Sequence, residues 1–206
     1  MRKHADEASS TKQDRHTELV KIAYHEIVEK GFEGLRIRDV AAKAGVNNAT
    51  LHYYFRTKET LIHGVVQYLM QEFTTQRIPR ENNEESNALN AIRYEFEDMR
   101  FRLKSMPEMF TVLAELSLRS RRDAGIAEMM KQTKLGWSHY LRGLLMDGIE
   151  QGVIRKSIDV EATIDLIMLQ MSAIGYQSVE LGYSDGLDRI ISLLIVQTER
   201  FLTDED

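Results

Sequence analysis

The stretch RIRDVAAKAGVNNATLHYYFRTK, residues 36–58, decides the fold, because it predicts two short helices joined at a glycine. From Ile37 onward, apolar residues recur at three- and four-residue steps, which places them on one buried helical face. Gly45 follows and can adopt the left-handed backbone conformation that ends a helix and turns the chain. Asn47 or Asn48 can then cap the second helix by accepting hydrogen bonds from its first amides.

The second of these helices carries side chains that suit DNA. Leu51 and Phe55, four residues apart, supply its inward face. The other positions hold small, hydroxyl, aromatic or amide groups, which fit base edges and phosphates: Asn48, Ala49, Thr50, His52, Tyr53 and Tyr54. Residues 36–58 also hold five basic residues against one acidic residue. Double-stranded DNA is therefore the expected partner of this stretch.

At these residues the chain resembles the tetracycline-repressor (TetR) family of bacterial transcription regulators. The resemblance rests on an ordered set of short matches: Gly31-Phe32, Asp39-Val40-Ala41, Ala44-Gly45-Val46, Thr50-Leu51, Tyr54-Phe55, Lys58-Glu59 and Leu61. It covers roughly the first third of the chain. Four residues depart from the family's common choices and bear on individual DNA contacts, not on the class: Arg36, Asn47, Ala49 and His52.

The resemblance implies an all-α protein of about nine helices, with an N-terminal three-helix helix-turn-helix head and a helical C-terminal body for ligand binding and dimerisation. We expect a disordered arm at residues 1–10, a DNA-binding domain at 11–62, and an effector-binding and dimerisation domain at 63–206. The residues expected to contact DNA are Arg36, Arg38, Asn47, Asn48, Ala49, Thr50, His52, Tyr53, Tyr54 and Lys58.

Composition narrows the class further. Only two prolines occur in 206 residues, and 43% of the residues are hydrophobic, which favours a packed helical protein. The absence of cysteine excludes disulfides, thiolate catalysis and zinc sites built on cysteine. The first 16 residues contain no apolar run, so we expect neither a signal peptide nor a membrane anchor, and we expect a cytoplasmic protein. No cofactor or metal is expected.

The net charge of −5 is unevenly distributed along the chain. Residues 1–62 carry 11 Lys and Arg against 9 Asp and Glu, whereas residues 63–206 carry 16 against 23. A basic head on an acidic body suits a duplex-binding protein, because phosphate neutralisation supplies most of the non-specific affinity. A solvated surface of mixed charge is the alternative that charge alone leaves open.

The remaining helices are predicted from apolar spacing and from capping residues. A first helix is expected over residues 11–30, and a fourth, capped by Thr57, over residues 58–77. Residues 79–87 are polar and predict a loop. Later helices are expected from Ala88, from Pro107, and over about 124–151, 162–181 and 187–202.

The last two helices are apolar on every side, so each must be buried on every side. The uncharged run Leu166–Val179 has 14 residues, too few to cross a bilayer, so the covering partner is expected to be protein. We expect a twofold homodimer in which these helices form a four-helix bundle. The residues predicted at its interface are Ile174, Ile191, Leu194 and Ile195.

Methionine and aromatic residues are frequent in the body. They are ordinary core on one interpretation, because methionine fills irregular gaps. On the other they line a cavity for an apolar or aromatic effector, which the resemblance implies. The residues expected at that cavity are Phe96, Met99, Phe110, Met130, Trp137, Tyr140, Met168 and Met171. The expected function is a repressor released from a palindromic operator by its effector, and an activator or co-repressed regulator is the runner-up.

Two other classes compete with a regulator. An enzyme is disfavoured, because the chain has no Gly-rich phosphate loop, GxSxG elbow or HExxH pair, and no histidine preceded by glutamate at a di-metal spacing. A helical protein-interaction module would explain the apolar C-terminal helices. It would not explain a basic, capped pair of helices with tyrosines on the outer face.

Overall fold

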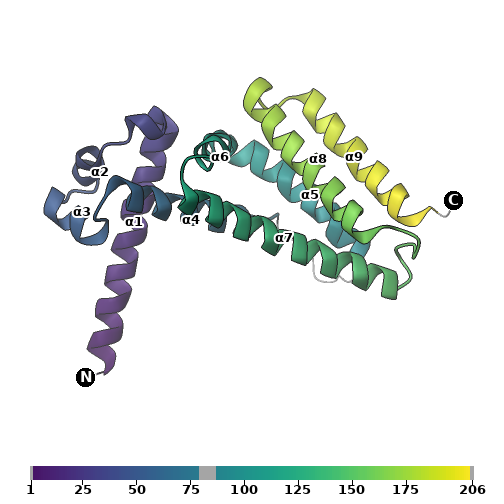
Figure 1. The fold of residues 1–206 in the computed structure, drawn as a ribbon, viewed down its shortest axis with the longest axis horizontal. Coiled ribbons are helices and arrows are strands. Elements are labelled where there is room, and N and C mark those ends of the chain that lie inside the picture. The colour runs from purple at the N-terminus through teal and green to yellow at the C-terminus, as the bar shows by residue number, and fades with distance from the viewer. Residues whose placement is uncertain (1, 79–86, 205–206) are drawn as a thin grey trace. The chain divides into compact units, whose positions relative to one another are not determined.

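The structure is a computed structural model that describes residues 2–78 and 87–204, with side chains described from residue 13 onward. These residues form nine helices and no strand (Figure 1), which confirms the all-α prediction. The helices are α1 (Arg2–Gly34), α2 (Ile37–Lys43), α3 (Asn48–Tyr54), α4 (Lys58–Thr75), α5 (Ala88–Ser105), α6 (Pro107–Arg119), α7 (Ala124–Glu150), α8 (Val160–Leu181) and α9 (Asp185–Thr203). Apart from Asn87, the predicted polar loop at 79–87 lies outside the described residues.

Helix α1 begins earlier than the sequence predicted. It starts at Arg2, in the segment expected to be a disordered arm, and residues 2–30 contain no proline or glycine that would interrupt it. Gly31 has φ 69° and ψ 172°, so the regular helix ends there, as predicted, and residues 32–34 form a separate turn.

The helices pack as two compact units. The head unit comprises residues 1–73 and 111–129, and the body unit comprises residues 74–110 and 130–206. Helices α4, α6 and α7 each contribute residues to both units.

The core of the head unit takes residues from α1, α2, α3, α4, α6 and α7. Its fully buried members include Leu19, Ala23, Ile27, Leu35, Val40, Leu51, Leu61, Val65, Leu116 and Ile126. On α1, Val20 and Tyr24 are also buried, whereas Val28 is 37% exposed.

Residues 111–129 join the head unit through polar and aromatic contacts. The Arg119 guanidinium lies 5.3 Å from the centre of the Phe32 ring, and its Nη1 is 3.2 Å from Glu33 Oε1. His63 Nε2 lies 3.3 Å from Asp123 Oδ1, and the same carboxylate accepts hydrogen bonds from the first amides of α7. The end of α6 and the start of α7 are therefore held against α1 and α4.

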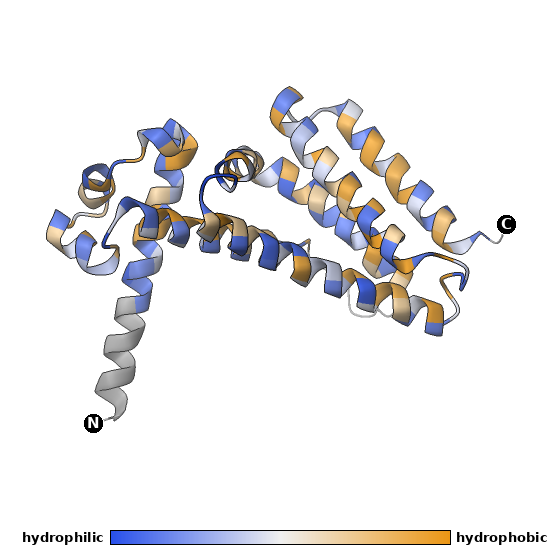
Figure 2. Ribbon diagram, viewed as in Figure 1, coloured by the Kyte–Doolittle hydropathy of each residue, from blue (hydrophilic) through white to orange (hydrophobic). Residues whose placement is uncertain are grey.

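In the body unit, α5 packs against α8 and α9. Ion pairs tie α5 to α9: Arg93 to Glu199 at 2.5 Å and Lys104 to Asp188 at 3.1 Å. The side chains of Asp159 and Ser184 cap α8 and α9, which fixes where each begins. Apolar residues recur along both helices (Figure 2). Even so, none of the helices in the described ranges combines the length and apolarity needed to cross a membrane.

Candidate nucleic-acid interface

Helices α2 and α3 are joined by a tight turn that backbone hydrogen bonds hold closed. The amide of Ala44 donates to Val40 O, and that of Val46 donates to Ala41 O, both at 3.0 Å. Gly45 between them has φ 65°, a left-handed conformation that strains a residue with a side chain. The predicted glycine-centred turn is therefore present.

Asn47 fixes the start of α3. Its Oδ1 accepts a hydrogen bond from the Thr50 amide at 2.8 Å and another from the Thr50 hydroxyl at 3.0 Å. Of the two asparagines that the sequence left open as caps, Asn47 is the one used. The carboxamide of Asn48 is thus left free of capping.

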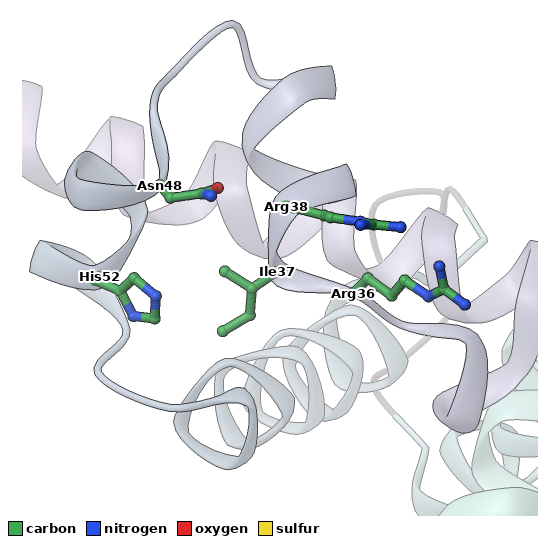
Figure 3. A pocket seen from close by; sticks show the side chains of 5 residues that line it. All are labelled: Arg36, Ile37, Arg38, Asn48 and His52. Atoms are coloured by element: carbon green, nitrogen blue, oxygen red, sulfur yellow. The ribbon is translucent and has the colours of Figure 1, made fainter.

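A concavity of about 480 Å³ opens between the start of α2 and the outer face of α3. Figure 3 shows its lining: Asn48 and His52 reach in from α3, and Ile37 lies opposite them. Arg36 and Arg38 lie beyond Ile37, with their guanidinium groups directed away from Asn48 and His52. Four of the five lining residues can donate hydrogen bonds, and two carry a permanent positive charge. This chemistry suits phosphate oxygens and the acceptor edges of bases.

The residues predicted to contact DNA fall into two groups by exposure. Arg36, Arg38, Asn47, Asn48, Ala49, His52 and Tyr53 are exposed, whereas Thr50, Tyr54 and Lys58 are half-buried. Tyr53 is 68% exposed, and its ring meets the Tyr54 ring edge to face at 5.2 Å. The Thr50 hydroxyl donates to the α3 cap, so it is already engaged.

A buried carboxylate on α1 holds α2 in place. The Glu26 side chain is fully buried; Lys30 Nζ lies 2.6 Å from its Oε2, and Lys43 Nζ lies 2.6 Å from its Oε1. The two ammonium groups, Lys30 first, hold the pKa of Glu26 below its ordinary value. At the other end of the contact, Arg15 Nη2 donates to Ala44 O at 3.0 Å and closes the last turn of α2 on α1.

Sequence reasoning missed the Glu26 brace, the ion-paired contact of Glu26 with Lys30 and Lys43 that holds α2 against α1. Lys43 is one of the five basic residues of 36–58 that were expected to favour DNA, but it pairs with Glu26 and, at 3.2 Å, with Glu29. One signal was available: Glu26 shares the inward stripe of α1 with Leu19 and Ile27, and a charge at such a position needs a partner. The identity of the partner depends on packing between helices, which periodicity does not give.

Lys58 lies at the start of α4, and Thr57 caps this helix as predicted. The Thr60 amide is 3.2 Å from Thr57 Oγ1, and the Thr57 amide is 3.1 Å from Thr60 Oγ1, a reciprocal pair. The carboxylate of Glu59 has its pKa lowered by its own backbone amide and by the Thr57 hydroxyl. The N-terminus of α4 is thus a well-ordered donor site with Lys58 beside it.

The residues predicted to bind an effector all lie in the body unit. Phe96, Met99, Phe110, Met168 and Met171 are buried, and Met130, Trp137 and Tyr140 are half-buried. Trp137 and Tyr140 are engaged with polar partners: the Trp137 indole donates to Glu95 Oε2 at 2.9 Å, and the Arg77 guanidinium lies 5.6 Å from the centre of the Tyr140 ring. Among the described residues, no group of three or more histidines and acidic side chains could hold a metal ion.

The residues predicted at the dimer interface need correction. Ile174, Ile191 and Ile195 are 3%, 0% and 8% exposed within a single chain, so they form its own core, and Leu194 is half-buried. The apolar residues that α8 and α9 leave exposed are different ones: Leu166, Leu169, Tyr176, Val179, Leu181, Ile190, Leu193, Val196 and Phe201. On helices that are apolar all round, the spacing of residues does not tell which face turns inward.

Sequence similarity to known proteins covers the helix-turn-helix segment and extends over most of the chain. Residues 19–65, which carry the concavity, match the family model described as bacterial regulatory proteins, tetR family. The fatty acid metabolism regulator protein of Bacillus subtilis is 22% identical over 156 residues, covering 76% of this chain and 79% of its own. The HTH-type transcriptional regulator YdeS of the same bacterium is 29% identical over 157 residues, covering 74% of this chain and 73% of its own.

Solved structures match the fold along nearly the whole chain. A TetR transcription regulator from Haloarcula marismortui has a TM-score of 0.80, covering 93% of this chain and 100% of its own, at 18% identity. A regulator from Saccharomonospora viridis, solved in complex with choline, has a TM-score of 0.76 at 17% identity, covering 94% of this chain and 100% of its own. At these identities the likeness concerns the fold.

Proposed function

Because the chain belongs to the TetR family of DNA-binding transcriptional regulators, we propose that it is a repressor that binds a palindromic operator as a homodimer and leaves it when a small apolar or aromatic effector binds. The observation that carries this proposal is the basic concavity between α2 and α3 (Figure 3). The Gly45 turn, the Asn47 cap and the Glu26 brace already hold α2 and α3 in place, so few groups have to become ordered when DNA binds.

The residues of the interface have different roles. Arg36 and Arg38 bind phosphates at the rim, and Asn48 and His52 reach base edges from α3. Ala49 and Tyr53 on the same helix lie close to the bases and the sugar-phosphate backbone. Thr50, Tyr54 and Lys58 support the phosphate contacts, and the positive end of the α4 dipole adds to the attraction of Lys58 for phosphate.

A second copy of the chain is the partner that the exposed face of α8 and α9 fits. Leu169 and Leu193 are 67% and 55% exposed, and they belong to apolar stripes on two helices that contact each other. An exposed apolar area of this kind is removed from water when two copies of the chain associate through it. A twofold dimer then places two heads on one duplex, which requires an operator with two inverted half-sites about 34–36 Å apart or slightly more.

Release by an effector requires a link between the body and the head. Helix α4 begins at Lys58 in the head unit and ends at Thr75 in the body unit, so it provides that link along the chain. A ligand that binds better when this helix is displaced must bind worse when DNA holds it. A coupling of about 1–3 kcal/mol lowers operator affinity about 5–150-fold.

Selection from a library of random duplexes tests the DNA-binding part of the proposal. The wild-type chain should enrich an inverted repeat, and the double variant Arg36→Ala, Arg38→Ala should enrich none. The matched control Lys131→Ala, Lys134→Ala removes the same charge from exposed positions on α7 and should enrich the wild-type sequence. Enrichment of one motif by all three proteins would show that the concavity does not read DNA.

A further inference from the structure

Helix α5 carries a row of buried charged residues that the DNA-binding proposal does not use. Glu95, Asp98 and Arg102 lie on one side of the helix at three- and four-residue steps and are 5%, 0% and 5% exposed. Burying a charge in a helical body is costly unless a partner compensates it. The row therefore needs an explanation beyond solvation of a surface.

The two carboxylates of the row are satisfied differently. Asp98 Oδ1 accepts a hydrogen bond from the Ile78 amide at 2.9 Å. Glu95 Oε2 accepts one from the Trp137 indole at 2.9 Å, which fixes the orientation of the carboxylate. Glu95 Oε1 is buried and accepts no hydrogen bond from any residue that the structure describes. One acceptor of a buried carboxylate is therefore left open.

Arg77 lies beside this open acceptor but does not bond to it. Its Nη1 is 3.6 Å from Glu95 Oε1, beyond hydrogen-bonding distance, while its Nε donates to Thr74 O at 3.2 Å. The guanidinium also lies 5.6 Å from the centre of the Tyr140 ring, and the side chain is 37% exposed. The Arg77 cation, whose Nε also lies 4.0 Å from Asp98 Oδ2, thus occupies the space between a buried carboxylate and an aromatic face.

We propose that Arg77 is an internal substitute for the effector's positive charge, and that an aliphatic ammonium group on an apolar or aromatic skeleton replaces it between Glu95 and Tyr140. This inference rests on the proposed ligand-released repressor and names the chemical class of its effector. An ammonium is more compact than a guanidinium and can donate to Glu95 Oε1 at a full hydrogen-bond distance of about 2.8 Å. The Tyr140 ring then receives the cation on its face.

Displacement of Arg77 also gives the effector a route to α4. Arg77 lies two residues after Thr75, the last residue of α4, so its contacts with Glu95 and Tyr140 secure the chain just beyond that helix. Replacing those contacts by a ligand releases this end of α4. The ligand and the fixed position of α4 then exclude each other, which is the sign that release from DNA requires.

The only tryptophan of the chain makes the site directly observable, because Trp137 hydrogen-bonds to Glu95. Three probes with one skeleton separate charge from apolar contact: 4-phenylbutylamine, 4-phenylbutanol and 4-phenylbutyrate. Titration of each into the full chain at pH 7, followed by Trp137 fluorescence, should show saturable binding of the amine at least about tenfold tighter than that of the alcohol. Equal binding of amine and alcohol, tighter binding of the butyrate, or no response to any probe overturns the proposal.

Variants locate the effect. Arg77→Ala should tighten amine binding several-fold because the competing cation is gone, whereas Glu95→Gln should weaken it at least about tenfold. Arg93→Ala is the matched control. It breaks the ion pair between Arg93 of α5 and Glu199 of α9, away from Glu95 and Tyr140, and should leave amine binding unchanged. If Glu95→Gln does not fold, the direction of the Arg77→Ala effect still decides, and weaker amine binding refutes the substitute role.

Operator binding without any probe is measured in parallel. A chain that binds its operator but shows no charge preference in Trp137 fluorescence retains the proposed function and loses this inference. A chain that binds the amine but no duplex loses the proposed function instead.

Discussion

Replacing Glu26 with glutamine keeps the shape of the side chain and removes the charge that holds α2 to α1. The carboxylate is fully buried and has ammonium groups at 2.6 Å on both oxygens. Glutamine can accept from one lysine only and leaves its amide group facing the other. The variant therefore loses charge-assisted bonds without opening a cavity.

The expected cost follows from the exposure of the two lysines. Breaking a fully buried ion pair costs about 3–5 kcal/mol, because the remaining charge stays uncompensated. Here Lys30 and Lys43 are 42% and 47% exposed, so water can solvate them once the carboxylate is gone. We therefore expect a loss of about 2–3 kcal/mol, which for a chain of this size lowers Tm by roughly 4–12 °C.

The pH dependence has a definite sign. Because the folded-state pKa of Glu26 is lowered, its contribution to stability is fully present above the unfolded-state pKa of about 4.5 and is lost as pH falls through the lower folded-state pKa. The difference in unfolding free energy between wild type and Glu26→Gln should be constant from about pH 6 to 8. It should shrink below about pH 4.5.

Thermal and urea unfolding followed by circular dichroism at 222 nm measure this difference, with Glu29→Gln as control. Glu29 is 56% exposed and pairs with Lys43 at 3.2 Å, so its replacement should cost no more than about 0.5 kcal/mol. Equal stabilities of the two variants, or a difference that grows toward low pH, would refute the assignment of Glu26 as the brace of α2.

Three further experiments test the interface and the dimer. Asn47→Ala removes the cap of α3 and should lower the unfolding free energy by about 1 kcal/mol in urea unfolding. Asn48→Ala should change the unfolding free energy by less than about 0.5 kcal/mol and should weaken operator binding. A larger loss of stability from Asn48→Ala than from Asn47→Ala would contradict the two roles. Lys58→Ala should weaken binding to all duplexes alike and reduce the salt slope by about one unit in anisotropy titrations, and an unchanged slope removes Lys58 from the phosphate contacts. Leu193→Glu should give a monomer in light scattering at micromolar concentration, while the exposed Leu118→Glu should remain dimeric; a dimeric Leu193→Glu rules out this face.

Local sequence signals predicted the turn between α2 and α3 and the starts of α3 and α4. Gly45 and the capping residues Asn47 and Thr57 act within four residues of their own positions, so the turn and both helix starts could be derived without tertiary contacts. The class of the fold followed in the same way, from helical spacing and the scarcity of proline.

Features that depend on packing between distant residues could not be derived. The pairing of Glu26 with Lys43 spans two helices. The row Glu95, Asp98 and Arg102 has the spacing of a solvated helix face, and only packing of the body shows that it is buried. On α8 and α9, apolar residues on all sides gave no inward direction, which is why core residues such as Ile191 were predicted at the interface.

The affinity ratio between an intact palindrome and the same duplex with one half-site scrambled tests the central claim most directly. Both duplexes present equal charge, so the ratio isolates recognition by the second head. For a homodimer that reads DNA with the concavity between α2 and α3, anisotropy titration should show at least about 100-fold weaker binding of the scrambled duplex, since several mismatched base pairs cost about 1–3 kcal/mol each. A ratio close to one would contradict a sequence-reading dimer.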